Sequence, residues 1–365
     1  MTDNFTVPDY NICREITVNG CTFSFPRRYD GLVHAGTGSF GTVLKGTDSV
    51  NNVNVAIKRI DYAYSLSNNI RNVFVGRRIY REMVLLCRLR HPNMVTMLYA
   101  YTPAASVSDL KELYIVMEAT DFTLDKADFH RDQKIISYVS YQILCGDLKP
   151  SNIGIISQSC TVKLLDFGIA RGVQEGVEGY ATARHWRAPE IIVEMEYNEK
   201  VDIWSIGCIV ADLILGHQIF PGEDSMKQWE EMVKVLGTPH ESFMNRIRNP
   251  AVLTYVKSLP IYFFIQWNRI IPEDRFSAAT EHWEQTLDNA RHFLSGLLVI
   301  DSEYRFSSTQ ALSHPYVRCW MKGNEVNLPT VDIQKDLEFG EKEGSGGVLR
   351  DSIFNMVKYL ERTAL

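Results

Sequence analysis

The chain has 365 residues, a length that suits two domains, and 45% of the residues are hydrophobic, which is enough apolar mass for a sizeable core. Its formal net charge is −6. Proteins that bind nucleic acid by neutralising phosphates usually carry a basic excess, so nucleic acid is not an expected partner. The composition therefore predicts a soluble globular protein.

Neither a disulfide framework nor a membrane segment is predicted. The seven cysteines form no CxxC pair and show no spacing with histidine that would suit zinc, so we expect free thiols. The N-terminus carries no basic leader before an apolar block and does not resemble a secretory signal. The longest apolar stretch, Trp204–Leu215, is interrupted by Asp212 and falls short of the ~20 residues that span a bilayer.

The first third of the chain alternates β-rich runs with turn residues. Residues 42–44, 53–60 and 113–117 are rich in β-branched and apolar residues and predict strands. Between Val73 and Arg90 apolar residues recur at steps of three and four, which is the helical period. This part therefore predicts a small twisted antiparallel sheet with one helix packed against it.

After Thr120 the pattern becomes largely helical. Helices are predicted at about 132–145, 200–215, 225–236 and 286–298, separated by loops that contain Pro and Gly. From Met321 onward a charged segment ends in an amphipathic stretch, Ile353–Leu360, which we expect to pack back on the body. The overall class predicted is α+β.

A glycine-rich run, Gly36–Val43, ends the first predicted hairpin. Glycines let backbone amides approach phosphate oxygens without a clash from Cβ. A dinucleotide site would need a helix next and an acidic residue about 20 positions on, whereas here a turn and the predicted strand of Lys58 follow. Taken alone, the run is also compatible with a plain hairpin.

Lys58 lies on a predicted buried strand, where an ammonium group needs an anionic partner. Phosphate groups or a helix carboxylate would serve. Glu82 on the predicted helix is the best candidate for an ion pair with it, although most helix glutamates are simply solvated.

Three strings follow in chain order: Asp147–Asn152, Asp166–Gly168 and Ala188–Glu190. Phosphoryl transfer needs a carboxylate to orient the acceptor hydroxyl, oxygen ligands for Mg²⁺ and a cation to balance developing charge. These needs are met, in that order, by Asp147, by Asn152 with Asp166, and by Lys149. Each string could arise by chance in a loop, but their order and spacing make chance a poor explanation.

With these motifs, the chain resembles a eukaryotic protein kinase, and within that family a MAP kinase of the stress-activated Jun N-terminal kinase (JNK) type. The resemblance runs from about Phe23 to Tyr359. It implies a bilobal protein-kinase fold with a small antiparallel β N-lobe that carries one helix and a larger, mainly helical C-lobe. The implied parts are an N-terminal extension (1–28), the ATP-binding N-lobe (29–118), the C-lobe with activation segment and a MAP kinase insert at about 240–285 (119–320), and a C-terminal extension (321–365).

The resemblance also implies a Ser/Thr protein kinase that transfers the γ-phosphoryl of ATP, with Mg²⁺, to protein substrates in stress signalling. Asp147 and Lys149 would be catalytic, and Asn152 and Asp166 would bind the metal. The residues implied in ATP binding are Ala35, Gly36, Thr37, Gly38, Ser39, Phe40, Gly41, Thr42, Val43, Lys58, Glu82, Met117 at the back of the pocket, and the hinge residues Glu118, Ala119 and Thr120. An ion pair between Glu190 and Arg305 would brace the C-lobe. The protein would be a monomer in cytoplasm and nucleus that is activated by upstream MAP kinase kinases.

The chain departs from the family pattern just before Asp147. Roughly a dozen residues that the family places there, including part of a helix and a His-Arg pair, are absent, and Cys145 and Gly146 occupy the His-Arg positions. Ala183 replaces a threonine that supports the catalytic loop. An active kinase with reduced turnover, a pseudokinase that binds ATP and partners, and an isoform or incomplete gene model all remain open.

Two regulatory features also differ from the family. The phosphorylation motif Thr-x-Tyr reads Glu178-Gly179-Tyr180. Glu178 carries less charge than a phosphothreonine, and it would either contact Arg78 and Arg81 weakly or remain solvated. The acidic docking patch of the family reads 321–325 here, with one carboxylate, so we expect weakened recruitment of basic docking peptides.

Overall fold

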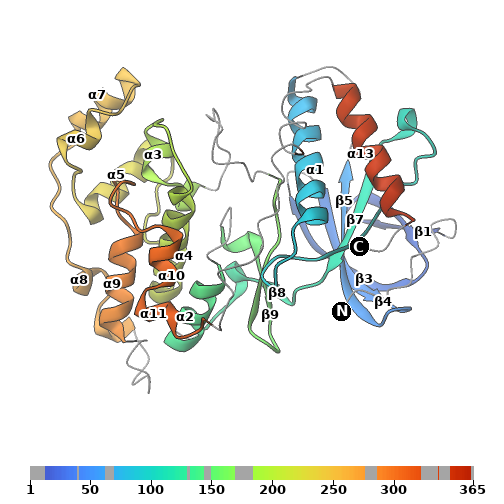
Figure 1. Ribbon diagram of the computed structural model, residues 1–365, viewed down its shortest axis with the longest axis horizontal. Coiled ribbons are helices and arrows are strands. Elements are labelled where there is room, and N and C mark those ends of the chain that lie inside the picture. Colours follow the sequence, from blue (N-terminus) through green and yellow to red (C-terminus); the bar gives the residue numbers. More distant parts are fainter. Residues whose placement is uncertain are drawn as a thin grey trace. The chain divides into compact units, whose positions relative to one another are not determined.

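The computed structural model describes residues 13–38, 41–61, 70–129, 132–143, 149–168, 184–275, 286–321, 336 and 346–362. These residues form two compact units (Figure 1). The first unit contains the described residues up to Asp121, together with Leu165–Gly168 and the C-terminal helix. The second unit contains the described residues from Phe122 to Leu164 and from Arg184 to Met321.

The first unit is built on an antiparallel sheet with strand order β3-β4-β5-β7-β6. Its strands are β3 (Tyr29–Gly38), β4 (Gly41–Asp48), β5 (Val53–Asp61), β6 (Met97–Tyr101) and β7 (Glu112–Glu118). The three predicted strands are present as parts of β4, β5 and β7. Sequence patterns missed β6 because all five of its residues are buried, so it lacks the alternation that marks a strand with one exposed face.

A hairpin of β1 (Cys13–Val18) and β2 (Cys21–Pro26) precedes this sheet. It lies within residues 1–28, the part predicted as an N-terminal extension. Asn19 and Gly20 form the turn with φ values of 51° and 78°, and Asn-Gly is the preferred pair for such a turn. Phe23 and Phe25, on β2, are buried in the core of the unit with Tyr114.

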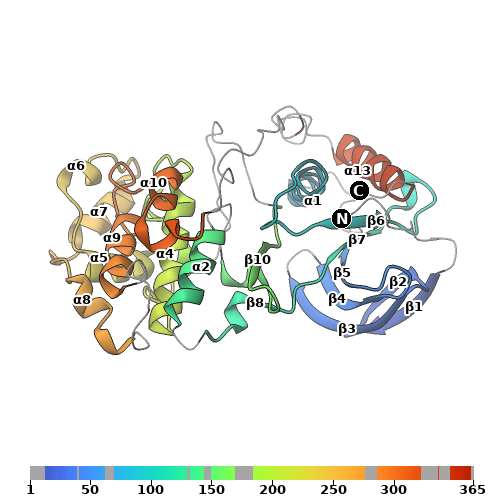
Figure 2. The ribbon, with the colours of Figure 1, turned by 60° about the horizontal axis from the view of Figure 1, so that its bottom comes forward.

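Helix α1 (Ile70–Arg88) covers the face of the sheet opposite the β1–β2 hairpin (Figure 2). Helix α13 (Gly346–Leu360) packs beside α1. The expected C-terminal helix is therefore present and begins earlier than its amphipathic part. Its most deeply buried residues, at 0–1% exposure, recur at helical spacing: Leu349, Ile353, Val357 and Leu360. Just after α13, Glu361 Oε1 accepts a hydrogen bond of 2.9 Å from the backbone N–H of Thr102, which helps to fix the helix on the unit.

The second unit is mainly helical, as predicted. Its longer helices are α2 (Gln133–Gln142), α4 (Lys200–Leu215), α5 (Ser225–Leu236), α7 (Pro250–Ser258) and α9 (Leu287–Leu297). Short helices are α3 (Pro189–Ile192), α6 (Glu241–Met244), α8 (Trp267–Ile270), α10 (Ser308–Leu312) and α11 (Pro315–Arg318). A small sheet joins β8 (Phe122–Thr123), β9 (Ile153–Ile156) and β10 (Thr161–Leu164).

Helix α4 contains the apolar stretch noted in the sequence. Its side chains are buried on most sides, with Trp204, Ile209 and Ile214 at 0% exposure, so its apolar character reflects a central position in the unit. Among the described residues, no helix is long and apolar enough to cross a membrane. The six cysteines in the described ranges form no disulfide.

Candidate active site

A buried ion pair between Lys58 on β5 and Glu82 on α1 lies at the centre of the first unit. The Nζ atom of Lys58 is 2.6 and 2.8 Å from the two carboxylate oxygens of Glu82, and the two side chains are 13% and 5% exposed. Burial acts to lower the pKa of Lys58, but the charges of Glu82 and Asp166 outweigh it, so the pKa is raised. Lys58 therefore stays protonated beside Glu82.

Asp166 adds a second carboxylate to this pair. Burial raises the pKa of Glu82, and the nearby charge of Asp166 raises it further. One ammonium and two carboxylates leave an excess of negative charge beside a buried ion pair, which favours a bound cation. Asp166 has the hard oxygen ligands that Mg²⁺ prefers, so the donor set fits that metal.

No described cluster of three or more His, Cys, Asp or Glu side chains could hold a metal ion by itself. This agrees with the way in which Mg²⁺ is usually bound, through one or two carboxylates with the remaining ligands from phosphates and water. Asn152, the other expected metal ligand, lies in the second unit and offers an amide oxygen.

The glycines of the run that the structure describes lie at the end of β3 and the start of β4, where Gly38 pairs with Gly41. Gly41 has a φ of +154°, and a Cβ there would lie 1.9 Å from the backbone oxygen of Arg59, so only glycine fits. A Cβ on Gly36 or Gly38 would meet nothing within 4 Å. The backbone at these two positions is therefore open to a ligand, while Ser39 and Phe40 lie outside the described residues.

The expected hinge follows β7. Met117 is 6% exposed, and the backbone N–H groups of Glu118 and Ala119 donate to the carbonyls of Thr96 and Asn54, at 3.0 and 3.2 Å. These two N–H groups are engaged within the protein. Adenine would therefore have to pair with other backbone groups of this segment.

The catalytic-loop residues that the structure describes belong to the second unit. Pro150–Asn152 forms a short 3₁₀ turn, in which Asn152 N–H donates to the carbonyl of Lys149 at 2.9 Å. Asp147 lies outside the described residues, as do Glu178, Tyr180 and Ala183. Helix α2 begins with an Asp132 N-cap and ends at Gln142, three residues before the predicted end.

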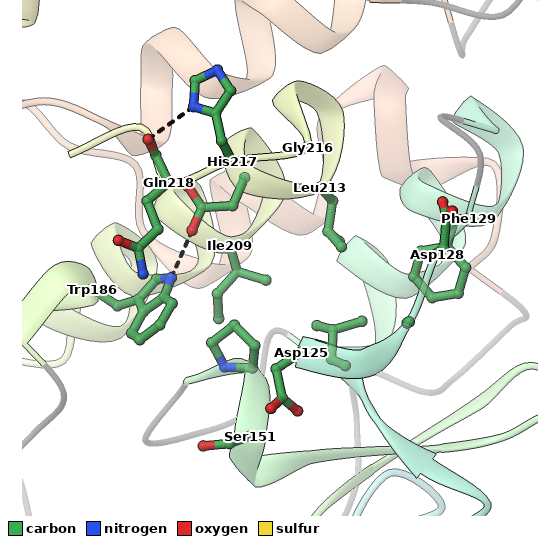
Figure 3. Close-up of a pocket in the computed structure, with 14 residues that line it drawn as sticks. Asp125, Asp128, Phe129, Ser151, Trp186, Ile209, Leu213, Gly216, His217 and Gln218 are labelled. Carbon is green, nitrogen blue, oxygen red and sulfur yellow. Dashed lines mark hydrogen bonds between the residues drawn. The ribbon is translucent and has the colours of Figure 1, made fainter. Parts of the chain in front are cut away.

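A cavity of about 880 Å³ adjoins Pro150 and Ser151. Figure 3 shows Trp186 and Gln218 on one side of it and Asp128 and Phe129 on the other. The described lining contains three carboxylates, Asp125, Asp128 and Asp212, and no lysine or arginine. The cavity therefore presents aromatic, apolar and acidic groups beside the catalytic loop.

Sequence reasoning missed Trp186 and noted Asp212 only as an interruption of an apolar stretch. Trp186 Nε1 donates to one carboxylate oxygen of Asp212 at 2.9 Å, and Ile219 N–H donates to the other at 2.7 Å. Burial raises the pKa of Asp212 to about 7 in spite of these bonds. An acidic residue inside an apolar helix was the signal available, because such a residue needs partners when it is buried.

The ion pair expected between Glu190 and Arg305 is present. Arg305 Nη1 and Nη2 donate to the two oxygens of Glu190 at 2.8 and 2.9 Å, and the side chains of Arg305 and Glu190 are 0% and 1% exposed. The guanidinium also lies over the ring of Trp204, 5.2 Å from its centroid. This pair joins helix α3 to the loop before α10.

Comparison with known proteins identifies the family of this chain. The family model described as "Protein kinase domain" matches residues 29–317. The chain is 37% identical over 358 residues to GLH-binding kinase 1 of Caenorhabditis elegans, covering 92% of this chain and 90% of that protein. It is also 37% identical over 330 residues to the stress-activated protein kinase JNK of Drosophila melanogaster, covering 86% of this chain and 87% of that protein.

The chain therefore belongs to the protein kinase family. Within the family it is a JNK-like MAP kinase, and its activity is that of a Ser/Thr protein kinase. The predicted α+β kinase fold, with a small antiparallel sheet and a larger helical part, is confirmed.

Proposed function

We propose that this kinase takes Mg-ATP as its phosphoryl donor and that Lys58, held by Glu82, positions the phosphates. The observation that carries the proposal is the buried Lys58–Glu82 pair with Asp166 beside it, because its excess negative charge suits a divalent cation. Asp166, and Asn152 as the family resemblance implies, would hold Mg²⁺, which would supply positive charge to balance that of the phosphates.

Asp147 orients the acceptor hydroxyl and Lys149 balances charge that develops on the phosphoryl group. The cavity beside Pro150 and Ser151 receives part of the protein substrate. Its position next to the catalytic-loop turn supports this assignment, since residues that flank an acceptor hydroxyl must lie against neighbouring surface.

Lys58→Met tests nucleotide binding. A ligand that binds the native state raises the melting temperature by mass action, so the wild-type protein should respond to Mg-ATP in a thermal-shift titration. The Lys58→Met variant should lose most of this response. Lys257→Met is a matched control, because Lys257 is exposed on helix α7. A wild-type protein without any response at millimolar Mg-ATP would contradict the proposal.

Turnover is expected to be low although Mg-ATP binds. Phosphoryl transfer depends on positioning, and a displacement of about 1 Å can cost ~10²-fold in rate. The residues missing before Asp147 remove support from this loop. We therefore expect a rate well below the ~1–100 s⁻¹ of ordinary kinases, and the Asp147→Asn variant should abolish what remains. Equal background rates for the two proteins would instead support a pseudokinase or a defective isoform.

We also propose that upstream MAP kinase kinases act on the chain and that it works as a monomer in cytoplasm and nucleus, as the resemblance to JNK implies. Docking of basic partner peptides should be weak because residues 321–325 carry one carboxylate.

A further inference from the structure

Arg81, directly before Glu82 on helix α1, is a buried arginine with a defined backbone partner. Arg81 is 6% exposed, and its Nη1 atom donates to the carbonyl oxygen of Gly168 at 3.0 Å. Burying a guanidinium is costly unless its N–H groups are hydrogen-bonded. This contact is therefore a fixed feature of the unit rather than a passing surface interaction.

Gly168 in turn is bonded to the candidate metal ligand. Its backbone N–H donates to Oδ1 of Asp166 at 3.0 Å. A Cβ added to Gly168 would lie 3.3 Å from that oxygen and 3.7 Å from the carbonyl oxygen of Arg78 on α1. The turn from Asp166 to Gly168 thus packs closely against helix α1, with Arg81 bonded to its last residue.

Helix α1 therefore contacts two parts of the candidate site from neighbouring positions. Successive residues of a helix project about 100° apart, so Arg81 and Glu82 reach different partners from the same turn. Glu82 holds Lys58, and Arg81 holds the turn that carries Asp166.

We propose that Arg81 is a positioning residue for Asp166. Its hydrogen bond to the Gly168 carbonyl fixes the orientation of the Gly168 backbone. In that orientation the Gly168 N–H donates to Oδ1 of Asp166 and so fixes the carboxylate. The inference rests on the proposed role of Asp166 in binding Mg²⁺. It differs from the expectation that Arg81 serves as a receiver for charge on the activation segment, because the contact to Gly168 requires neither Glu178 nor a phosphate.

The test compares the full-length wild-type chain, treated with phosphatase, with Arg81→Met and Arg81→Lys. Free Mn²⁺, used as the probe for the divalent site, is measured by electron paramagnetic resonance in the presence of saturating ADP. Groups that orient a metal ligand typically contribute 10- to 100-fold in metal affinity, so we expect Arg81→Met to weaken Mn²⁺ binding by about 10-fold. Arg81→Lys, which can still donate one hydrogen bond, should weaken it less.

Arg88→Met is the matched control, because Arg88 lies on the same helix and its side chain is 57% exposed. Affinity for ADP without metal is measured in parallel and should change by less than about 2-fold. The proposal is overturned if Arg81→Met binds Mn²⁺ like the wild type, or if ADP affinity falls as much as Mn²⁺ affinity, which would indicate general loss of structure. If Arg81→Met does not fold, the same comparison is made with Arg81→Lys. A wild-type chain that binds neither ADP nor Mn²⁺-ADP would instead refute the proposed function itself.

Discussion

The substitution Arg305→Ala should strongly destabilise the second unit. It would leave the carboxylate of Glu190, whose side chain is 1% exposed, without its countercharge. It would also remove the hydrogen bonds that Arg305 donates to the carbonyls of Val299 and Lys200, at 3.0 and 2.8 Å. Removing one partner of a buried ion pair costs about 3–5 kcal/mol, and the lost carbonyl partners place this site toward the upper end of that range.

Urea unfolding followed by tryptophan fluorescence measures this cost. All six tryptophans fall between residues 186 and 320, so the signal reports the second unit. With a urea dependence of about 1–3 kcal/mol/M, the midpoint should fall by about 1 M or more. The exposed Arg318 provides the control Arg318→Ala, which should leave the midpoint unchanged.

A double-mutant cycle with Glu190→Gln separates the cost of the uncompensated Glu190 charge from the cost of the other lost contacts. If the uncompensated carboxylate is the main cost, the double variant should be less destabilised than the sum of the two single variants, by about 1–3 kcal/mol. An Arg305→Ala midpoint equal to that of the wild type would refute the reasoning, because it would mean that the pair is open to solvent.

Three further outcomes are expected. His314 accepts a hydrogen bond from Tyr316 N–H at Nδ1 and lies 2.8 Å from His292 through Nε2, and burial lowers its pKa from 6.5 to about 4. Because the unfolded chain protonates His314 more readily than the folded chain, wild-type stability should fall relative to His314→Asn as pH decreases from 6.5 to 4 in urea titrations. A stability difference that does not change with pH would count against this expectation. For Asp212 the pH dependence of stability has the opposite sign, because its pKa is raised from 3.8 to about 7. The wild type should therefore lose stability relative to Asp212→Asn as pH rises from 3.8 to about 7. No change over this range would show that the carboxylate is solvated. Finally, Ile353→Asp should lower the melting temperature of the first unit and promote aggregation, because Ile353 is 0% exposed. The control Tyr359→Ala, at a residue that is 65% exposed, should have little effect. Equal melting temperatures for the two variants would mean that α13 does not stabilise the unit.

Much of this protein is determined by local sequence patterns. The helical period between residues 73 and 90 predicted α1, and the β-branched runs predicted β4, β5 and β7. The glycine run and the strings around Asp147, Asp166 and Glu190 identified the kinase family from the sequence alone, because phosphoryl transfer requires these residue types in this order. The hairpin of β1 and β2 could also have been predicted from the sequence, because Asn19-Gly20 is a preferred turn pair.

Other features depend on contacts between residues far apart in the chain. The interaction of Arg81 with Gly168 joins positions separated by 87 residues, and that of Arg305 with Glu190 joins positions separated by 115. Whether an arginine or an aspartate is buried and paired, as for Asp212 with Trp186, depends on which elements pack around it. Periodicity describes one element at a time, so only the tertiary structure decides these partners.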